Sequence, residues 1–494
     1  MGASTLTPEW LHRRAELSPG RLALVSGEIR WTFAELDQRA DDMARRLASA
    51  GVTAGDRVAT LLPNGAVPVV ALHALARLGA VHVPLNLRLA ATELAWQMEQ
   101  CSVSLLVHQP GNAKQARDAA GLPGIALVSV GTADCDALEL ITASPAGLAV
   151  SQRRVDLAAV QSIVYTSGTT GRPKGALLTF GNHWWTALGS ALNLGLQADD
   201  RLLASLPLFH VGGMAILWRS VIYGCTAVVQ ERFDPAAMNA AIDNAGITIV
   251  SVVAAMLQQL LDQRGSKPYP PSLRCVLLGG GPAPRPLLEA CAARHIPVVQ
   301  TYGLTETGSQ AVTLAPEDAL RKRGSAGKPL FHLELRIDAD GQEAAPGETG
   351  EIWLRGPSVS PGYFGDHGES RHSDDWLHTG DLGWVDAEGY LFVEDRRDDL
   401  IISGGENVYP AEVEAVLLAH PAVAEAGVTG RTDQRWGQVP VAAVVFRSGV
   451  TASETEVLAF CAERLARYKV PTSVTVRSAL PRTASGKLQR RLLT

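Results

Sequence analysis

The chain has 494 residues, 46% hydrophobic and 19% charged, which is too long for one ordinary hydrophobic core and predicts two or more domains. Its formal net charge of −6 excludes the basic footprint of a nucleic-acid-binding protein, and no apolar run reaches the length of a transmembrane helix. The first residues lack the apolar core of a signal peptide and the six cysteines are scattered without metal-binding spacing, so we expect a cytoplasmic protein.

Predicted strands and helices alternate in the first part of the chain. Apolar runs predict strands at 22–25, 57–62, 81–85 and 103–107, and helical periodicity predicts helices at 36–47, 66–78 and 93–101. Thr32 followed by Glu35 is typical of a helix-capping box. This alternation indicates parallel sheets covered by helices on both faces. Residues 111–154 are less regular, and we assign no function to them.

The segment Tyr165–Gly175, YTSGTTGRPKG, follows a predicted strand and has the composition of a phosphate-binding loop. Its glycines allow a close backbone approach, its N–H groups and hydroxyls can donate to phosphate oxygens, and its lysine adds positive charge. The candidate ligands are Thr166, Ser167, Gly168, Thr169, Thr170, Gly171 and Lys174. A Ser/Gly surface linker is the alternative. The P-loop of ordinary NTPases is excluded, because Lys174 is followed by glycine.

Further candidates follow predicted strands, where α/β folds place their sites. His210 follows the strand that begins at Arg201, and Gly279, Gly280 and Gly281 follow the strand at 273–278. Residues 302–307, YGLTET, follow another apolar run. A tyrosine face can stack on a base, and a glutamate is a suitable Mg²⁺ ligand. The structural alternatives are a core histidine at His210 and a helix cap at Thr305.

A charged run at 395–399 precedes a new βα pattern with helices expected at 411–419 and 454–465 and strands at 439–446 and 473–476. We expect an N-terminal domain at 1–395 that binds ATP and an acid, a hinge at 396–398, and a mobile C-terminal domain at 399–494. The predicted fold class is α/β, with a large domain of mixed and parallel sheets flanked by helices and a small α+β domain.

In order, these motifs resemble those of the adenylate-forming superfamily of acyl-CoA synthetases, adenylation domains and luciferases. The resemblance covers essentially the whole chain and adds the TGD run ending at Asp381 and the run from Pro481 to Lys487. It implies that a carboxylic acid reacts with ATP and Mg²⁺ to give an acyl-adenylate, and that coenzyme A then takes the acyl group. Whether the protein forms a homo-oligomer is left open.

The resemblance also implies roles for individual residues. Lys487 would contact the acyl carboxylate and the α-phosphate, Glu306 would hold Mg²⁺, and His210 would lie beside the carboxylate. Nucleotide contacts are implied for Gly279, Gly280, Gly281, Tyr302, Gly303, Thr305, Asp381 and Arg396. Rotation would occur about Asp398, and Ser403, Gly404 and Gly405 would line the thiol tunnel. Ser309 is a further candidate for substrate contact.

Longer stretches resemble the family of 2-succinylbenzoate–CoA ligases of menaquinone biosynthesis: 179–183, 190–195, 277–284, 324–330 and 399–412. That acid has a second carboxylate, and we expect Arg219 to face it directly or through water; a surface arginine is the equal alternative. Gly212 departs from the serine expected there. The other readings are a ligase for another aryl or medium-chain fatty acid, or an amino-acid adenylation domain, which the absence of a following carrier segment disfavours.

Overall fold

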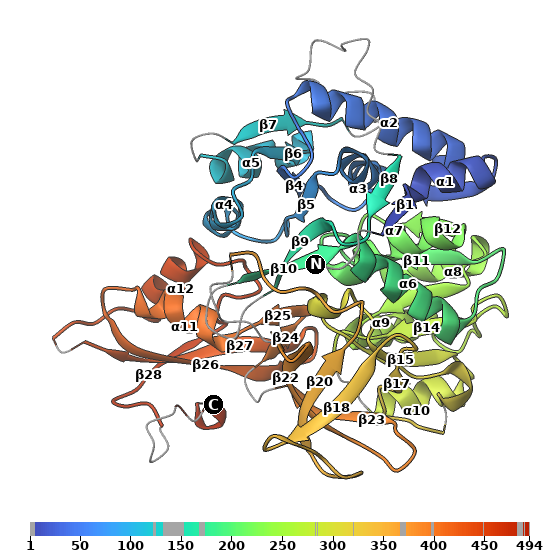
Figure 1. Ribbon diagram of the computed structural model, residues 1–494. Helices are drawn as coiled ribbons and strands as arrows, with labels where there is room; N and C mark the ends of the chain where they lie inside the picture. The colour runs from blue at the N-terminus through green and yellow to red at the C-terminus, as the bar shows by residue number, and fades with distance from the viewer. Residues whose placement is uncertain are drawn as a thin grey trace. The chain divides into compact units, whose positions relative to one another are not determined.

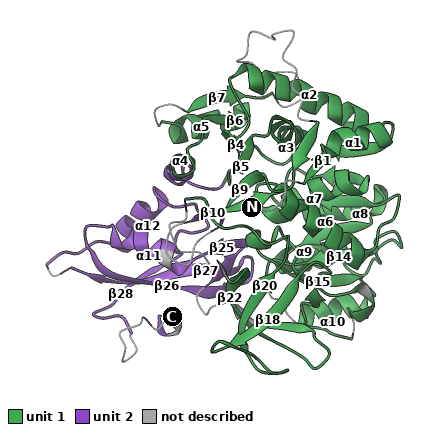
Figure 2. Cartoon of the chain, in the orientation of Figure 1, with its two compact units in different colours: residues 1–87, 98–164, 175–394 green, residues 88–97, 165–174, 395–494 purple. Residues whose placement is uncertain are grey.

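The computed structural model describes residues 5–121, 125–131, 153–166, 173–281, 283, 285–319, 321–365, 372–396, 400–447, 449–481, 488 and 490–493. The chain forms two compact units (Figure 2). Unit 1 comprises Met1–Leu87, Met98–Val164 and Gly175–Glu394, and unit 2 comprises Arg88–Gln97, Tyr165–Lys174 and Asp395–Thr494. No feature of the sequence indicated that the two short segments belong to unit 2. The hinge at 396–398 stays a prediction.

The first sheet has six strands in the order β10-β9-β5-β4-β6-β7. Their bounds are β4 Arg57–Leu61, β5 Val81–Pro84, β6 Leu105–His108, β7 Ala126–Ser129, β9 Val160–Thr166 and β10 Lys174–Thr179. β4 pairs in parallel with β5 and β6, as the alternating pattern predicts. α2 (Phe33–Ser49) begins at the predicted capping box, in which Thr32 and Glu35 bond reciprocally, and α3 (Ala66–Leu78) follows β4.

The second sheet has nine strands, several of which are labelled in Figure 1. Most of the candidate residues of unit 1 follow its strands in the chain. Its central strands β11 (Arg201–Ala204), β13 (Ile249–Val252), β14 (Cys275–Leu278) and β15 (Val298–Tyr302) are parallel neighbours. β12 (Thr226–Val229), β2 (Leu22–Ser26) and β3 (Ile29–Thr32) extend one side, and β16 (Val312–Thr313) and β17 (Lys328–Pro329) the other. The accompanying helices are α6 (Phe180–Leu194), α7 (Val211–Tyr223), α8 (Pro235–Asn244), α9 (Ala254–Arg264) and α10 (Arg285–Ala293).

A third sheet of unit 1 is antiparallel in every pair that the structure describes by register. It contains β18 (Glu334–Ala339), β19 (Gln342–Glu343), β20 (Gly350–Arg355), β21 (His372–Ser373) and β22 (Trp376–Val385), and β23 (Leu391–Arg396) pairs with β22. The mixed and parallel α/β class predicted for the large domain is confirmed. Among the described residues no helix is both long and apolar enough to cross a bilayer.

Unit 2 is built on a five-stranded sheet of β24 (Ile401–Ser403), β25 (Glu406–Val408), β26 (Val423–Asp433), β27 (Gly437–Phe446) and β28 (Val474–Val476). α11 (Pro410–Leu418) and α12 (Glu454–Ala462) cover it. Its core is mainly aliphatic, with Val413, Val444 and Val457 fully buried. The α+β character expected of the smaller domain is therefore confirmed, and both helices begin within one residue of their predicted starts.

Candidate functional site

The carboxyl ends of parallel strands meet at one edge of the nine-stranded sheet, and Gly279–Gly281 lie there. Leu278 at the end of β14 is in register with Val252 on β13 and Gln300 on β15. Gly280 has φ 78°, and a Cβ on it would lie 2.9 Å from Val253 Cγ1. The turn is therefore specific to glycine, and it gives the edge a backbone surface that a flat ring can approach.

Tyr302 and Asp381, both predicted to bind the nucleotide, are in direct contact. The Tyr302 hydroxyl donates to Asp381 Oδ2 at 2.6 Å, and both side chains are buried. The backbone N–H of Asp381 donates to Thr379 Oγ1. The hydrogen bond links β15 of the nine-stranded sheet to β22 of the antiparallel sheet. A carboxylate is a suitable acceptor for hydroxyl donors such as those of a ribose.

Glu306 lies in a short 3₁₀ turn, Thr305–Thr307, directly after β15. The side chain is 7% exposed, and its Oε1 accepts from the Tyr363 hydroxyl at 2.6 Å. Tyr363 belongs to no motif of the sequence and lies far along the chain. Mg²⁺ is commonly held by one or two carboxylates and phosphate oxygens. One oriented carboxylate fits that mode, and the described part of the chain contains no cluster of three His, Cys, Asp or Glu residues that could hold a metal alone.

Gly303 and Ser309 close the same turn against each other. A Cβ on Gly303 would lie 1.6 Å from the backbone oxygen of Ser309. Ser309 has φ 115°, a conformation that non-glycine residues rarely adopt. Such strain persists where the surroundings over-determine the backbone, and it is common at functional sites. The glycine at 303 therefore allows Thr305 and Glu306 to turn back across the strand end.

His210 is the N-cap residue of α7 and lies beside Phe209, with ring centroids 4.6 Å apart. It follows β11, which belongs to the same parallel set as β14 and β15. The first turn of α7 presses on the preceding loop, because a Cβ on Gly213 would lie 2.3 Å from the carbonyl oxygen of Pro207. A Cβ on Gly212 would make only an ordinary van der Waals contact, with Leu206 Cδ1 at 3.7 Å.

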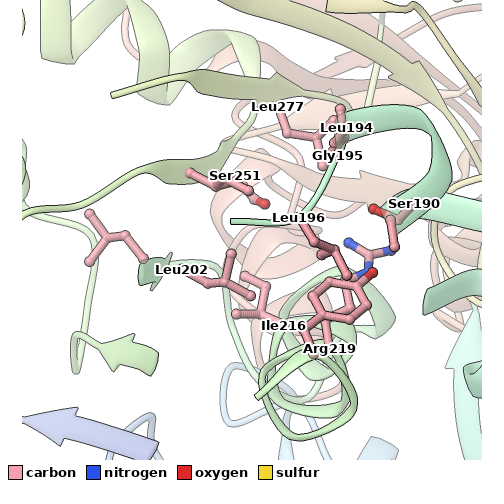
Figure 3. A pocket seen from close by; sticks show the side chains of 13 residues that line it. Ser190, Leu194, Gly195, Leu196, Leu202, Ile216, Arg219, Ser251 and Leu277 are labelled. Atoms are coloured by element: carbon pink, nitrogen blue, oxygen red, sulfur yellow. The ribbon is translucent and has the colours of Figure 1, made fainter. Parts of the chain in front are cut away.

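Arg219 is 5% exposed, so the alternative of a surface arginine is wrong. Its Nε and Nη2 have no hydrogen-bond partner among the described residues. Burial lowers its pKa, which the nearby Tyr223 partly offsets. The side chain lines a small cavity of about 20 Å³, enough for one water molecule (Figure 3). Other lining residues are Ser190 on α6, Ser251 on β13 and Leu277 on β14.

Unit 2 carries two further groups of candidates. Thr166, at the end of β9, donates through its hydroxyl to the carbonyl of Lys174 at 3.4 Å. Ser403 ends β24, and Gly404 and Gly405 form the turn to β25. Gly404 has φ 59°, and a Cβ on it would lie 2.8 Å from the ring of Trp436. This half-exposed tryptophan carried no motif in the sequence.

Other predicted residues are not placed. Ser167, Gly168, Thr169, Thr170, Gly171, Asp398 and Lys487 lie outside the described residues. Arg396 ends β23, and only its backbone is described. The roles of all of these residues stay predictions.

A model of the AMP-binding enzyme family matches residues 11–364, and one of the AMP-binding enzyme C-terminal domain matches residues 412–487. The chain belongs to this family of adenylate-forming enzymes, which confirms the class predicted from the motifs. It is similar to the 2-succinylbenzoate–CoA ligase of Geobacillus kaustophilus (strain HTA426), with 50% identity over 495 residues, 99% of this chain and 98% of that one.

Two solved structures of o-succinylbenzoate CoA synthetase from Bacillus subtilis are also similar. A double mutant bound to its product analogue OSB-NCoA is 46% identical with a TM-score of 0.92, covering 99% of each chain. The complex with ATP and magnesium ion is 45% identical with a TM-score of 0.76, covering 99% of this chain and 100% of that one.

Proposed function

We propose that this protein is an AMP-forming 2-succinylbenzoate–CoA ligase. The proposal rests on sequence identity: this chain is 49–50% identical to 2-succinylbenzoate–CoA ligases over nearly the full length of both chains. The edge formed by Gly279–Gly281, Tyr302, Glu306 and Asp381 supports it, because these residues offer the surfaces and acceptors that an adenine nucleotide requires. ATP, Mg²⁺ and coenzyme A are the accompanying small molecules, as in the relatives with bound ligands.

The reaction has two steps. A carboxylate oxygen of the acid attacks the α-phosphorus of ATP, and the bond to the β-phosphate breaks, releasing pyrophosphate. The thiolate of coenzyme A then attacks the acyl carbon and AMP leaves. A carboxylate is a weak nucleophile that phosphates repel, so the site must orient both reactants and neutralise charge.

The described residues supply much of that orientation. Asp381, held by Tyr302, would accept the ribose hydroxyls, and Glu306, held by Tyr363, would bind Mg²⁺, which neutralises phosphate charge when present. Lys487 would add positive charge in the first step.

Arg219 would supply the charge for the spare carboxylate of the acid. It lies on α7, the helix that His210 caps, and beneath strands that end at the nucleotide edge. An unpaired buried guanidinium is costly, and an anionic substrate group, direct or through one water, would relieve that cost.

The test is pyrophosphate release with ATP, Mg²⁺ and a panel of acids: 2-succinylbenzoate, benzoate, octanoate, palmitate and amino acids. We expect a kcat/KM for 2-succinylbenzoate well above the others, followed by CoA-dependent formation of its thioester. Preference for a monocarboxylate would overturn the substrate assignment while leaving the AMP-forming class. A cytoplasmic location and any homo-oligomer stay predictions.

A further inference from the structure

The residues that follow Lys487 are tied to the sheet of unit 2 by a two-pronged ion pair. Arg490 donates through Nε and Nη2 to Oε1 and Oε2 of Glu414, each at 2.9 Å. Glu414 lies on α11 and is 8% exposed. Its Oε1 also accepts the backbone N–H of Val428 on β26 at 2.8 Å. One carboxylate therefore joins α11, β26 and the C-terminal segment, and the forked geometry fixes direction as well as distance.

Apolar packing against the sheet of unit 2 holds the same segment. A Cβ on Gly427 would lie 3.0 Å from Leu488 Cδ2 and 2.8 Å from Leu493 Cδ1, so the missing side chain leaves the space that these leucines fill. Leu493 and Leu480 are buried in one small cluster with Ala443. Leu480 precedes and Leu488 follows residues 482–487, so both flanks of that stretch are seated on β26 and β27.

A second arginine secures the end of the segment. Arg477, directly after β28, donates to the carbonyl oxygens of Leu492 and Leu493 at 3.1 and 2.9 Å. The main hydrophobic core of unit 2 is a separate cluster, around Val413 and Val444. The contacts therefore serve the C-terminal segment more than the core.

We propose that Glu414 and Arg490 are positioning residues for the adenylation step, holding the backbone that presents Lys487. The inference rests on the proposed function, in which Lys487 acts in the first step alone. Leu488 is covalently bonded to Lys487, and Arg490 follows three residues after the lysine. Because these two neighbours are anchored to unit 2, we infer that they restrict the backbone position from which the lysine side chain extends. A displacement of about 1 Å in a reacting group can cost 10²-fold in rate.

The test compares the two half-reactions in Glu414→Gln, because glutamine keeps an oxygen for the Val428 N–H and loses the charge. We expect kcat for pyrophosphate release to fall about 10- to 100-fold, with KM for ATP within about twofold and a Tm that falls but stays well above the assay temperature. Thioester formation from supplied acyl-adenylate and coenzyme A should stay near wild type. Arg490→Lys, which keeps charge without the fork, should give an intermediate loss.

Glu334→Gln is the matched control, because Glu334 also accepts both prongs of an arginine, Arg355, on the antiparallel sheet of unit 1. Neither half-reaction should change in it. Equal loss of both half-reactions in Glu414→Gln, or unfolding of this variant at the assay temperature, would overturn the inference in favour of a structural role. Lys487→Ala distinguishes failure of the proposed role of Lys487 from failure of the positioning role of Glu414 and Arg490. If the Lys487→Ala variant selectively loses adenylation while Glu414→Gln does not, only the positioning inference fails. If it spares adenylation, the proposed role of the lysine fails first.

Discussion

Among single residues, Arg219 stands out because its burial is not balanced by partners in the described part of the chain. Arg264 provides the contrast within the same unit. It is also buried, yet its guanidinium donates to Asp243, Asn239 and two backbone carbonyls. A paired buried arginine stabilises its surroundings, whereas an unpaired one lowers stability and is retained where a ligand uses it.

We expect opposite stability effects from two matched substitutions. Arg219→Met should raise the free energy of unfolding, because it removes an uncompensated buried charge, and it should raise KM for 2-succinylbenzoate about 10- to 100-fold, the worth of a charged hydrogen bond. Arg264→Met should lower the free energy of unfolding and leave KM unchanged. Denaturant titrations and initial rates measure both. An unaltered KM in Arg219→Met would contradict contact with the spare carboxylate.

The hydrogen bond between Tyr302 and Asp381 predicts the effect of removing one atom, the Tyr302 hydroxyl oxygen. Tyr302→Phe removes the donor that orients the carboxylate, so KM for ATP should rise about tenfold, in line with hydrogen bonds to charged groups. Tyr390→Phe is the control, because the Tyr390 hydroxyl also donates to a carboxylate, Asp318, on another part of unit 1. If both variants bind ATP equally well, Asp381 does not depend on Tyr302.

At the scale of elements, what the sequence could predict depended on local signals. The capping box predicted at Thr32 marked the start of α2, and it is present, whereas the box that Thr179 and Asn182 form at the start of α6 was seen only in the structure. Helix α7 was missed because nearly all of its side chains are buried, so it has no polar face and no amphipathic period. A surface position for Arg219 therefore stood as an equal alternative to contact with the spare carboxylate.

Contacts between distant segments were equally invisible. Tyr302 and Asp381 are separated by 79 positions, and only the tertiary fold brings β15 beside β22. The glycine motifs were recognisable, since a turn that requires glycine leaves its mark in the sequence. The partners Tyr363 and Trp436 belong to no motif and could not be found without the structure.

Helix α7 offers a test of how tightly its start is fixed. Gly213→Ala would place a methyl group against the Pro207 carbonyl and should cost about 1–3 kcal/mol, as overpacking does, while shifting His210 and raising KM for the acid. Gly212→Ala would make only an ordinary contact with Leu206 and should be neutral or stabilising by up to about 1 kcal/mol through helix propensity. Thermal unfolding and acid-dependent rates distinguish them. Equal behaviour of the two variants would show that the helix start can adjust.

For the molecule as a whole, acid sensitivity follows from three fully buried histidines of unit 1. His73 lies on α3, His82 on β5 and His183 on α6. Burial lowers the pKa of each to about 3, with positive charges nearby adding to the effect at His73 and His183. These side chains are neutral when folded at any ordinary pH, whereas in the unfolded chain they take up protons below about 6.5.

The sign follows from proton uptake. Below pH 6.5 the unfolded state binds more protons, so the free energy of unfolding falls as the pH falls, by about 1.4 kcal/mol per pH unit for each histidine. The loss should continue toward pH 3 and vanish above pH 7. From these three histidines, denaturant unfolding at pH 7.5 and 5.5 should therefore differ by about 4 kcal/mol, before ordinary carboxylates titrate. His73→Leu should remove about a third of that difference. His332, whose pKa burial lowers to about 4, adds to the difference in the same direction. A stability unchanged between the two pH values would mean that water reaches these rings in the folded protein.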